Sequence, residues 1–165
     1  MDNIKARFRQ YQEAIETSNI VSKTDTNGTI TFVNDEFCKM SGFTREELIG
    51  ANHNIVRHPE VPKEVFARLW DTILAKKVHK GTIRNRTKDG RDVYLNTTII
   101  PILDLSGQIE EFLAIRYDVT DVINLNNELE KTKKELLNLN ENLENRVAEQ
   151  TAELVNLNQN LENLV

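Results

Sequence analysis

The chain is 165 residues long; 39% of its residues are hydrophobic, 28% are charged and one is a cysteine. This length suits one domain with an appendage, and the composition excludes a disordered or collagen-like chain. A single cysteine excludes a disulfide framework, and no apolar run is long enough to cross a bilayer. The charged N-terminus is unlike a signal peptide, so we expect a cytoplasmic protein without direct membrane insertion.

The formal net charge of -5 lies in the C-terminal part of the chain. Residues 119–165 hold four basic and nine acidic side chains, and the basic and acidic residues of the remainder balance. Neither part offers the basic face that nucleic-acid binding usually needs. We therefore expect no nucleic-acid partner.

Residues 1–18 predict a short amphipathic helix. Its apolar side chains recur at helical spacing: Ile4, Phe8, Tyr11 and Ile15. The period then changes, and strands are expected at 20–23 and 29–33. Between them, residues 25–28 end in Asn-Gly, which favours the positive φ of a tight hairpin turn.

The middle of the chain contains start signals for helices. A helical pattern follows Asn34, and Thr44 and Glu47 have the spacing of a capping box that opens a short helix. Pro62 suits the first turn of a longer helix that runs to about Lys76.

Three further strands are expected at 79–86, 91–102 and 108–118, because these segments are rich in Val, Ile, Thr and Tyr. Strands that cluster around a helical middle predict an α+β fold with a five-stranded antiparallel sheet and helices on one face. Such an arrangement leaves a pocket between the sheet and the inserted helices.

In the tail, the residues of one helical face step alternately by three and four positions, as in a coiled coil. The seam positions are Val122, Leu125, Leu129, Thr132, Leu136, Leu139, Leu143, Val147, Gln150, Leu154, Leu157, Leu161 and Leu164. Two successive steps of four end at Val147 and form a stutter, which locally unwinds a supercoil. We expect a coiled-coil helix that forms a parallel homodimer; a bundle with a helix of another protein is the alternative.

The order of these elements and three short strings resemble a PAS sensory domain. The strings are Asn34-Asp-Glu-Phe37, residues 41–50 and Asp118-Val-Thr120. The resemblance implies a PAS fold and three parts: an N-terminal helix (1–18), a PAS sensor domain (19–120) and a coiled-coil signalling helix (121–165).

Three further strings, at 53–59, 66–72 and 81–90, are similar to the Aer-type branch of redox and energy-taxis sensors. The chain also resembles the stand-alone PAS subunits of bipartite Cet-type energy-taxis systems. The resemblance implies FAD as the cofactor and a pocket lined or supported by Asn34, Arg57, His58, Trp70 and Asn85. Two positions depart from that branch: Glu60 replaces the usual Asp, and His79 replaces the usual Trp.

A flavin needs an apolar slot for its rings and hydrogen-bond partners at its polar edge. Phe66 and Trp70 can form the slot, although their helical spacing by itself favours ordinary core packing. The Asn85 amide can both donate and accept near a ring that changes protonation, and His79 is expected beside it. Arg57 can neutralise a phosphate or a reduced ring.

Other chemistries have weaker signals. Heme is the second cofactor possibility, because His53, His58 or His79 can ligate iron. The histidines and Cys38 show no zinc-ligand spacing, so we expect no metal site. Cys38 reads as a small buried hydrophobe, which argues against a light-driven cysteinyl–flavin adduct. No catalytic motif is present, and we expect no catalytic residues and no enzyme.

We therefore expect a cytosolic sensor of redox or energy state that binds a flavin. Its coiled coil would relay the state of the flavin to a membrane-bound, chemoreceptor-like signalling protein. Two alternatives remain open. The chain can be the sensory part of a histidine kinase or a diguanylate cyclase, or a cofactor-free PAS scaffold that only dimerises.

Overall fold

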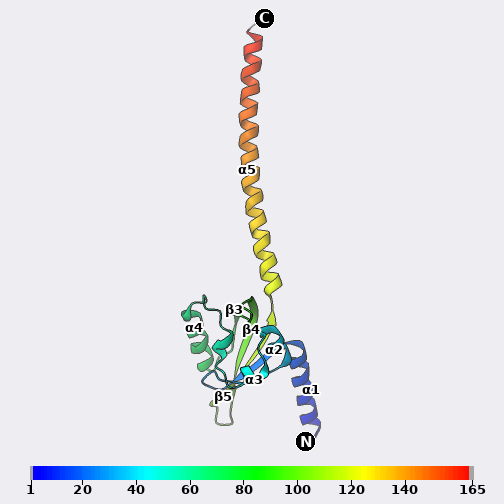
Figure 1. Ribbon diagram of the computed structural model, residues 1–165, viewed down its shortest axis with the longest axis vertical. Helices are drawn as coiled ribbons and strands as arrows, with labels where there is room; N and C mark the ends of the chain where they lie inside the picture. The colour runs from blue at the N-terminus through cyan, green and yellow to red at the C-terminus, as the bar shows by residue number, and fades with distance from the viewer. Residues whose placement is uncertain (1, 164–165) are drawn as a thin grey trace. The chain divides into compact units, whose positions relative to one another are not determined.

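The computed structural model describes residues 2–163 and contains two compact units, with the boundary between Asp121 and Val122. The first unit contains α1 (Asp2–Ser18), β1 (Ile20–Thr24), β2 (Ile30–Val33), α2 (Asp35–Ser41), α3 (Arg45–Leu48), the 3₁₀ helix η1 (His53–Val56), α4 (Lys63–Leu74), β3 (His79–Arg86), β4 (Asp92–Leu103) and β5 (Ile109–Asp118) (Figure 1). Helix α5 (Thr120–Glu162) begins at the end of the first unit and continues through the second. Met1 of the predicted first helix and Leu164 of the predicted seam lie outside the described residues.

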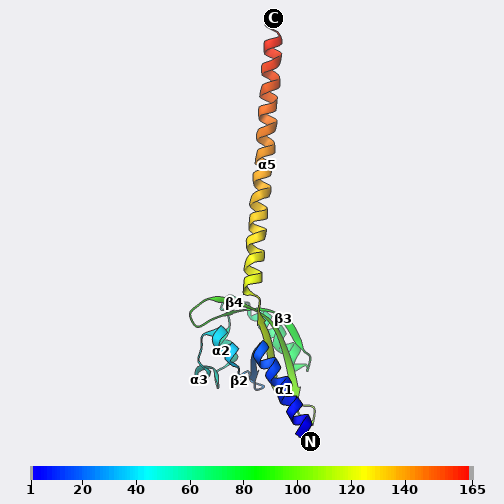
Figure 2. The ribbon, with the colours of Figure 1, turned by 90° about the vertical axis from the view of Figure 1, so that its right-hand side faces the viewer.

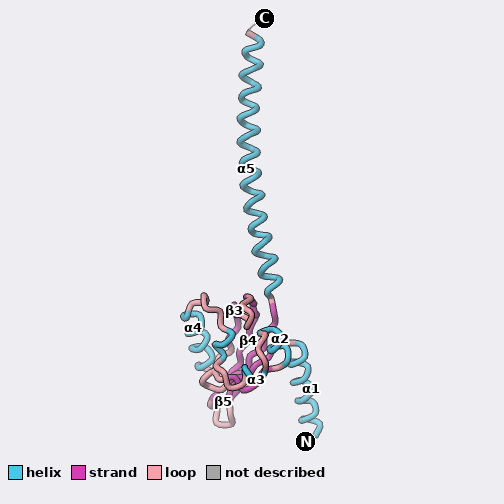
Figure 3. Tube along the Cα trace, viewed as in Figure 1, coloured by secondary structure: helices cyan, strands magenta, loops and turns pink. Residues whose placement is uncertain are grey.

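The strands form one five-stranded antiparallel sheet in the order β2-β1-β5-β4-β3, which confirms the predicted α+β fold. The strands are magenta in Figure 3 and the helices are cyan. Strands β1 and β5 are neighbours although they lie far apart in the sequence: Ile20 pairs with Arg116, and Thr24 pairs with Phe112. Strand β3 has the predicted bounds, and the ends of the other strands differ from the prediction by at most one residue.

One face of the sheet is buried, because side chains alternate along a strand and the helices cover the apolar side. The inward side chains of β4 are buried: Val93, Leu95, Thr97 and Ile99. One apolar cluster joins the sheet to α2, α3 and η1: Ile20, Ile30, Val33, Phe37, Leu48, Val56 and Leu95. A second cluster joins the sheet to α4: Leu69, Ile73, Ile99, Phe112 and Ala114.

The short helices α2 and α3 begin at the predicted signals. Asn34 caps the N-terminus of α2, and Gly42 closes its C-terminus with a φ of +75°. Thr44 and Glu47 form the predicted capping box at the start of α3. Helices α2 and α3 lie next to each other in the two views turned by 90° (Figure 1 and Figure 2).

The turn between β1 and β2 differs from the predicted Asn-Gly hairpin turn. Gly28 has a φ of +82°, but Asn27 does not take a positive φ. The reason is Asp25, whose Oδ1 accepts hydrogen bonds from the backbone N–H of Asn27 at 2.9 Å and of Thr29 at 2.8 Å. An aspartate that accepts from the following backbone closes the turn and leaves the left-handed conformation to the glycine.

Replacing Gly28 with alanine is expected to destabilise the protein by about 2–3 kcal/mol. The positive φ strains any L-residue, and a Cβ at this position would lie 3.1 Å from Cζ2 of Trp70. Gly90 is the matched control, because it has a φ of +89° and a Cβ added there would meet no heavy atom within 4 Å, so Gly90→Ala reports backbone strain alone. Urea unfolding followed by Trp70 fluorescence measures both; equal losses would contradict the contact with Trp70.

Helix α5 has 43 residues. At about 1.5 Å of rise per residue it is roughly 65 Å long. The seam leucines up to Leu157 face solvent, with Leu125 and Leu136 each 65% exposed and Leu154 62% exposed. None of the helices in residues 2–163 combines the length and the apolar character that a membrane span requires.

Candidate functional site

A cavity of about 130 Å³ lies between the buried face of the sheet and the helices η1 and α4. Its apolar walls are Val56, Phe66, Leu69, Trp70, Ile73, Ile83, Ile99, Phe112 and Ala114. Its polar lining is Ser22, Thr24, Asn52, His53, Asn54, Arg57, Asn85 and Arg116. The predicted pocket between sheet and inserted helices is therefore present.

The aromatic wall is built by α4 against β5. The rings of Trp70 and Phe112 meet edge to face, with centroids 5.7 Å apart and an angle of 85°. On its other side, Trp70 covers Gly28, where the lack of a side chain lets the indole approach the backbone. A slot whose apolar walls include aromatic rings suits a flat aromatic ligand.

Arg57 and Asn85 form one polar end of the cavity. The guanidinium carbon of Arg57 lies 3.9 Å from the centroid of the Phe66 ring, and its Nη2 donates to the carbonyl oxygen of Val61 at 3.4 Å. An isolated antiparallel bridge joins Arg57 to Asn85 on β3. The Asn85 side chain is buried against the cavity, so its amide faces the space that a ligand would fill.

Arg116, His53 and Ser22 form the second polar end. Arg116 is only 4% exposed; its Nη1 donates to Ser22 Oγ at 2.9 Å, and its Nη2 lies 3.0 Å from His53 Nε2. The Phe37 ring closes the base, with its centroid 5.7 Å from that of His53 and 5.6 Å from the guanidinium carbon of Arg116.

Burial determines the protonation states of Arg116 and His53 at this second polar end. Burial lowers the pKa of Arg116 to about 10, so the guanidinium stays charged at neutral pH. Burial, and next the charge of Arg116, lower the pKa of His53 to about 3, so the imidazole is neutral. Because a guanidinium only donates, His53 Nε2 must accept, and the ring proton lies on Nδ1.

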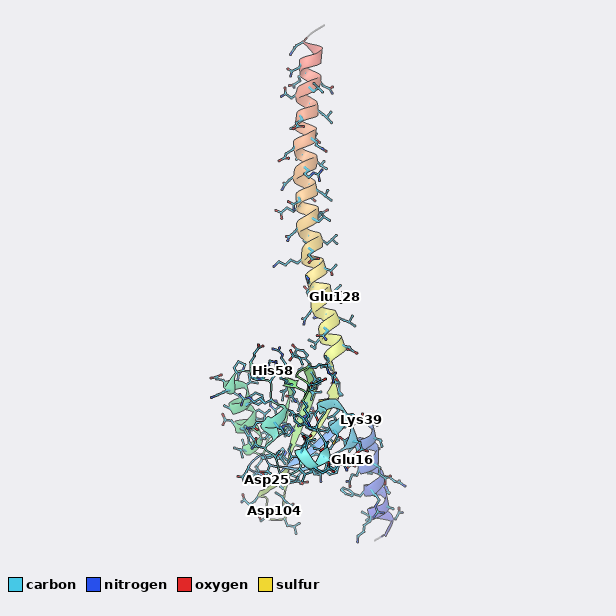
Figure 4. All side chains as sticks on the ribbon, viewed as in Figure 1. Glu16, Asp25, Lys39, His58, Asp104 and Glu128 are labelled. Carbon is cyan, nitrogen blue, oxygen red and sulfur yellow. The ribbon has the colours of Figure 1, made fainter. Side chains whose placement is uncertain are left out.

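His58 does not line the cavity but braces the segment that carries Arg57. Its side chain is fully buried, its Nδ1 accepts from the backbone N–H of Glu60 at 3.1 Å, and its Nε2 lies 3.0 Å from Asp92 Oδ1 (Figure 4). The Nε2–H is poorly aligned with that oxygen, so the contact is electrostatic more than a directed hydrogen bond. Arg84 joins Glu60 to Asp92 and closes a ring of polar contacts between the 58–60 loop and the β3–β4 pair.

Hydrogen bonding to Arg84 holds the pKa of Asp92 below its ordinary value. The carboxylate is therefore charged at neutral pH and keeps its contacts with both Arg84 and His58. Glu60, at the position where the Aer-type branch usually has Asp, reaches Arg84 Nη1 at 3.0 Å. In this chain the longer acid is thus part of the brace around His58.

Besides His58, two predicted site residues lie away from the cavity lining. Asn34 holds the start of α2: its Oδ1 accepts from the backbone N–H of Val21 and Phe37, and its Nδ2 donates to the carbonyl oxygens of Glu16 and Asn19. The Asn34 amide therefore makes all of its hydrogen bonds to the backbone around β1 and α2. Asn34 supports this part of the fold and does not line the cavity.

His79 begins β3 and pairs with Ile99 of β4, on the buried side of the sheet. Its half-buried ring lies over Gly81, where a Cβ would be 3.5 Å from His79 Nε2. Burial lowers the pKa of His79. The ring is therefore near the end of the cavity floor, while Ile83 and Asn85 of the same strand line the cavity itself.

Of the seven predicted site residues, the structure brings four to the cavity: Arg57, Phe66, Trp70 and Asn85. Sequence reasoning missed the cluster of Ser22 and Arg116 entirely and considered His53 only as an iron ligand. A signal was available in β5, where the inward alternation Phe112, Ala114, Arg116 places a charged residue on the buried face.

The histidine geometry also bears on the heme alternative. His53 is the histidine on the cavity lining, and its Nε2 faces the Arg116 guanidinium, which is a poor arrangement for binding iron. Within residues 2–163, no group of three or more His, Cys, Asp or Glu side chains is placed to hold a metal ion.

Residues 6–119 match the family described as PAS fold. The aerotaxis receptor of Escherichia coli (strain K12) is 36% identical over 106 residues, which is 64% of this chain and 21% of the receptor. The nitrogen fixation regulatory protein of Klebsiella pneumoniae is 28% identical over 105 residues, again 64% of this chain and 21% of that protein. The chain thus spans about a fifth of the length of these relatives.

Solved structures share the fold at lower identity. The PAS domain of a protein from Colwellia psychrerythraea superposes with a TM-score of 0.63 at 23% identity, covering 69% of this chain and 98% of that one. A light-oxygen-voltage domain studied with a flavin analogue gives a TM-score of 0.62 at 17% identity, covering 73% and 93%. These structures share the fold, and the match of residues 6–119 to the family model shows that the chain belongs to the PAS family.

Proposed function

We propose that this protein is a flavin-binding PAS sensor of redox or energy state, and that FAD is the flavin. The observation that supports this proposal most strongly is the cavity, which has aromatic and aliphatic walls between two polar ends. The similarity to an aerotaxis receptor agrees with a role in sensing the respiratory or redox state. The proposed role is binding and signalling, without turnover of a substrate.

The chemistry of the cavity lining fits a flavin, and the cavity of about 130 Å³ would have to widen to hold the whole ring system, since ligand pockets usually measure about 300–1,000 Å³. Trp70, Phe112 and Phe66 offer aromatic surface for the apolar ring system, and Asn85 offers an amide that both donates and accepts. Arg57 is half-buried and near the exposed Asn52 and Asn54, where a phosphate can keep part of its hydration. When bound, a flavin supplies a ring whose charge and hydrogen bonding change on reduction.

The visible absorption spectrum of the purified full chain tests the proposal. We expect the bands of an oxidised flavin, which bleach on addition of dithionite, and FAD in the supernatant after acid release. A heme spectrum would support the second cofactor instead. A colourless protein that takes up no added flavin would contradict the proposal and favour a cofactor-free scaffold.

Asn85→Leu is expected to weaken flavin binding about tenfold, because the substitution removes a hydrogen-bonding amide from a desolvated site. Asn96→Leu is the matched control, since Asn96 lies on β4 opposite Thr82 and its side chain is on the other face of the sheet. Titration of both variants with FAD, followed by flavin fluorescence, gives the dissociation constants. Equal affinities in the two variants would remove Asn85 from the site.

A route from the cavity to α5 is part of the proposal. Val119 N–H donates to the carbonyl oxygen of Tyr94 at 2.8 Å, and Tyr94 N–H donates to Thr120 Oγ1 at 2.9 Å. Thr120 N–H in turn donates to Asp118 Oδ1 at 2.8 Å. Tyr94 lies on β4 next to Val93, the strand partner of Asn85, so a shift of β3 against β4 would reach the first turn of α5.

We propose that α5 pairs in parallel with the α5 of a second copy and forms a coiled coil. The support is the row of exposed leucines at heptad spacing, because a single helix that exposes such a row gains stability by burying it. A paired helix with a stutter at Val147 has alternative packings of similar energy, which suits transmission of a small shift. The proposed recipient is a membrane-bound chemoreceptor-like protein.

A further inference from the structure

Arg116 is the feature of the cavity that the fold does not explain. It is 4% exposed, and among the side chains that the structure describes no carboxylate forms an ion pair with it. Its two hydrogen-bond partners, Ser22 and His53, are neutral. A buried guanidinium is ordinarily paired with an acid, since removal from water is costly unless an opposite charge replaces the solvent.

Ser22 and His53 orient Arg116 without neutralising it. Because His53 Nε2 accepts from Arg116, and because Ser22 Oγ also lies 3.4 Å from the same nitrogen, the three groups hold one another in place. If the guanidinium were absent, the Ser22 hydroxyl would still have His53 Nε2 as an acceptor. The cluster is therefore able to stay hydrogen-bonded with or without the charge.

The position of Arg116 places that charge across the cavity floor from Asn85. Asn85 on β3 pairs with Val93 of β4, and Arg116 on β5 pairs with Thr97 of β4. The two residues are therefore separated by four positions in the strand direction and lie on the two strands that flank β4. Strand spacings put their Cα atoms roughly 16 Å from each other. Both residues line the same cavity, so a ligand that fills it lies between the Asn85 amide and the Arg116 guanidinium.

We propose that Arg116 is the charge-recognising group of the cavity: it pairs with an electron-rich edge of the bound ring and favours the form of the ligand that carries negative charge. This inference rests on the proposed flavin function and adds that the reduced, anionic ring binds more tightly than the oxidised ring. The ligand class is a flat heteroaromatic compound with carbonyl or ring-nitrogen acceptors. Arg57, which is half-buried, is left to contact a phosphate.

The test compares the full chain with Arg116→Met and Arg57→Met, using riboflavin, FMN and FAD as probes. If Arg116 contacts the ring, Arg116→Met is expected to raise the dissociation constants of all three flavins by a similar factor of at least ten. Arg57→Met weakens FMN and FAD more than riboflavin. A loss in Arg116→Met that is confined to FMN and FAD would assign Arg116 to the phosphate and overturn the proposal. Arg86→Met, on the exposed side of β3, is the matched control.

A potentiometric titration of the bound flavin gives a second readout. A tenfold loss of preference for the reduced form lowers the midpoint potential of a two-electron couple by about 30 mV. We expect a drop of at least this size in Arg116→Met and no change in Arg86→Met. An unchanged midpoint potential in Arg116→Met would overturn the charge preference even if affinity falls.

The third measurement does not depend on flavin. In the flavin-free chain, Arg116→Met is expected to have a melting temperature equal to or above that of the unchanged protein, because a charge without a partner is removed from the interior. A melting temperature lower by several degrees would make Arg116 a structural residue and overturn the proposal. If the unchanged protein binds no flavin, the proposed function fails, and this comparison still decides whether Arg116 is kept for a ligand.

Discussion

Phe37→Ala is expected to lower the free energy of unfolding by about 3–5 kcal/mol, the range for deleting a fully buried aromatic side chain. Phe37 has no exposed surface and packs among Ile20, Leu48 and Leu95 where α2 meets the sheet. Its ring is also the base on which His53 and Arg116 rest. The substitution therefore leaves a void under the polar end of the cavity as well as in the core.

Urea unfolding followed by the fluorescence of Trp70, the single tryptophan of the chain, measures this loss. Phe32→Ala is the matched control, because Phe32 is half-buried on β2 and its removal is expected to cost about 1 kcal/mol. A loss in Phe37→Ala no larger than that of Phe32→Ala would show that the packing around α2 is not as described.

Leu136→Glu is expected to raise the dissociation constant of the proposed dimer at least a thousandfold. Leu136 is a seam position of α5, and burying a leucine contributes about 2–3 kcal/mol per helix, counted twice in a symmetric pair. Two glutamates facing each other in the seam add repulsion. Because the isolated helix is rich in Asn, a weak helix former, part of its helical circular dichroism should be lost with the pairing.

Leu137→Glu is a closely matched control for this prediction. Leu137 is 62% exposed in α5, nearly the same as Leu136, but it lies one position off the seam. Sedimentation equilibrium of the full chain is expected to give a dimer for the unchanged protein and for Leu137→Glu, and a monomer for Leu136→Glu at micromolar concentration. Similar behaviour of the two variants would contradict the heptad register, and a monomeric unchanged protein would contradict the pairing.

Local sequence signals predicted most of the fold because the interactions that determine it are local. The capping box at Thr44 and Glu47 is closed within four residues, and the strand of 79–86 follows its own composition. The sheet order depends on the pairing of β1 with β5, which are far apart in the sequence. The general pattern of strands and helices indicated this pairing, but no single residue did.

The candidate site was predictable only in part, because its contacts cross long stretches of sequence. His53 and Arg116 are 63 positions apart, and Ser22 and Arg116 are 94 positions apart. A histidine in an irregular segment suggested metal binding, whereas its actual neighbour is a cation. Arg116 was missed since a charged residue near the end of a strand is ordinarily read as solvent-facing.

Asn34 illustrates the opposite case. The resemblance to the Aer-type branch suggested a pocket residue, but the helical pattern that follows Asn34 is also a capping signal, and the structure uses the side chain as the cap of α2. The local signal placed the side chain correctly at the helix start. Whether a residue supports or lines a cavity depends on which way the adjoining helix packs, and the local pattern does not contain that information.

The connection at the start of α5 has a consequence for how such sequences can diverge. Tyr94 makes its hydrogen bonds to Val119 and Thr120 with backbone atoms, its carbonyl oxygen and its N–H. The side chain at position 94 can therefore vary without breaking these two bonds. Asp118 and Thr120 contribute side-chain oxygens and lack that freedom. Homologues that keep this junction should therefore tolerate many residue types at 94 while retaining an acceptor at 118 and a hydroxyl at 120.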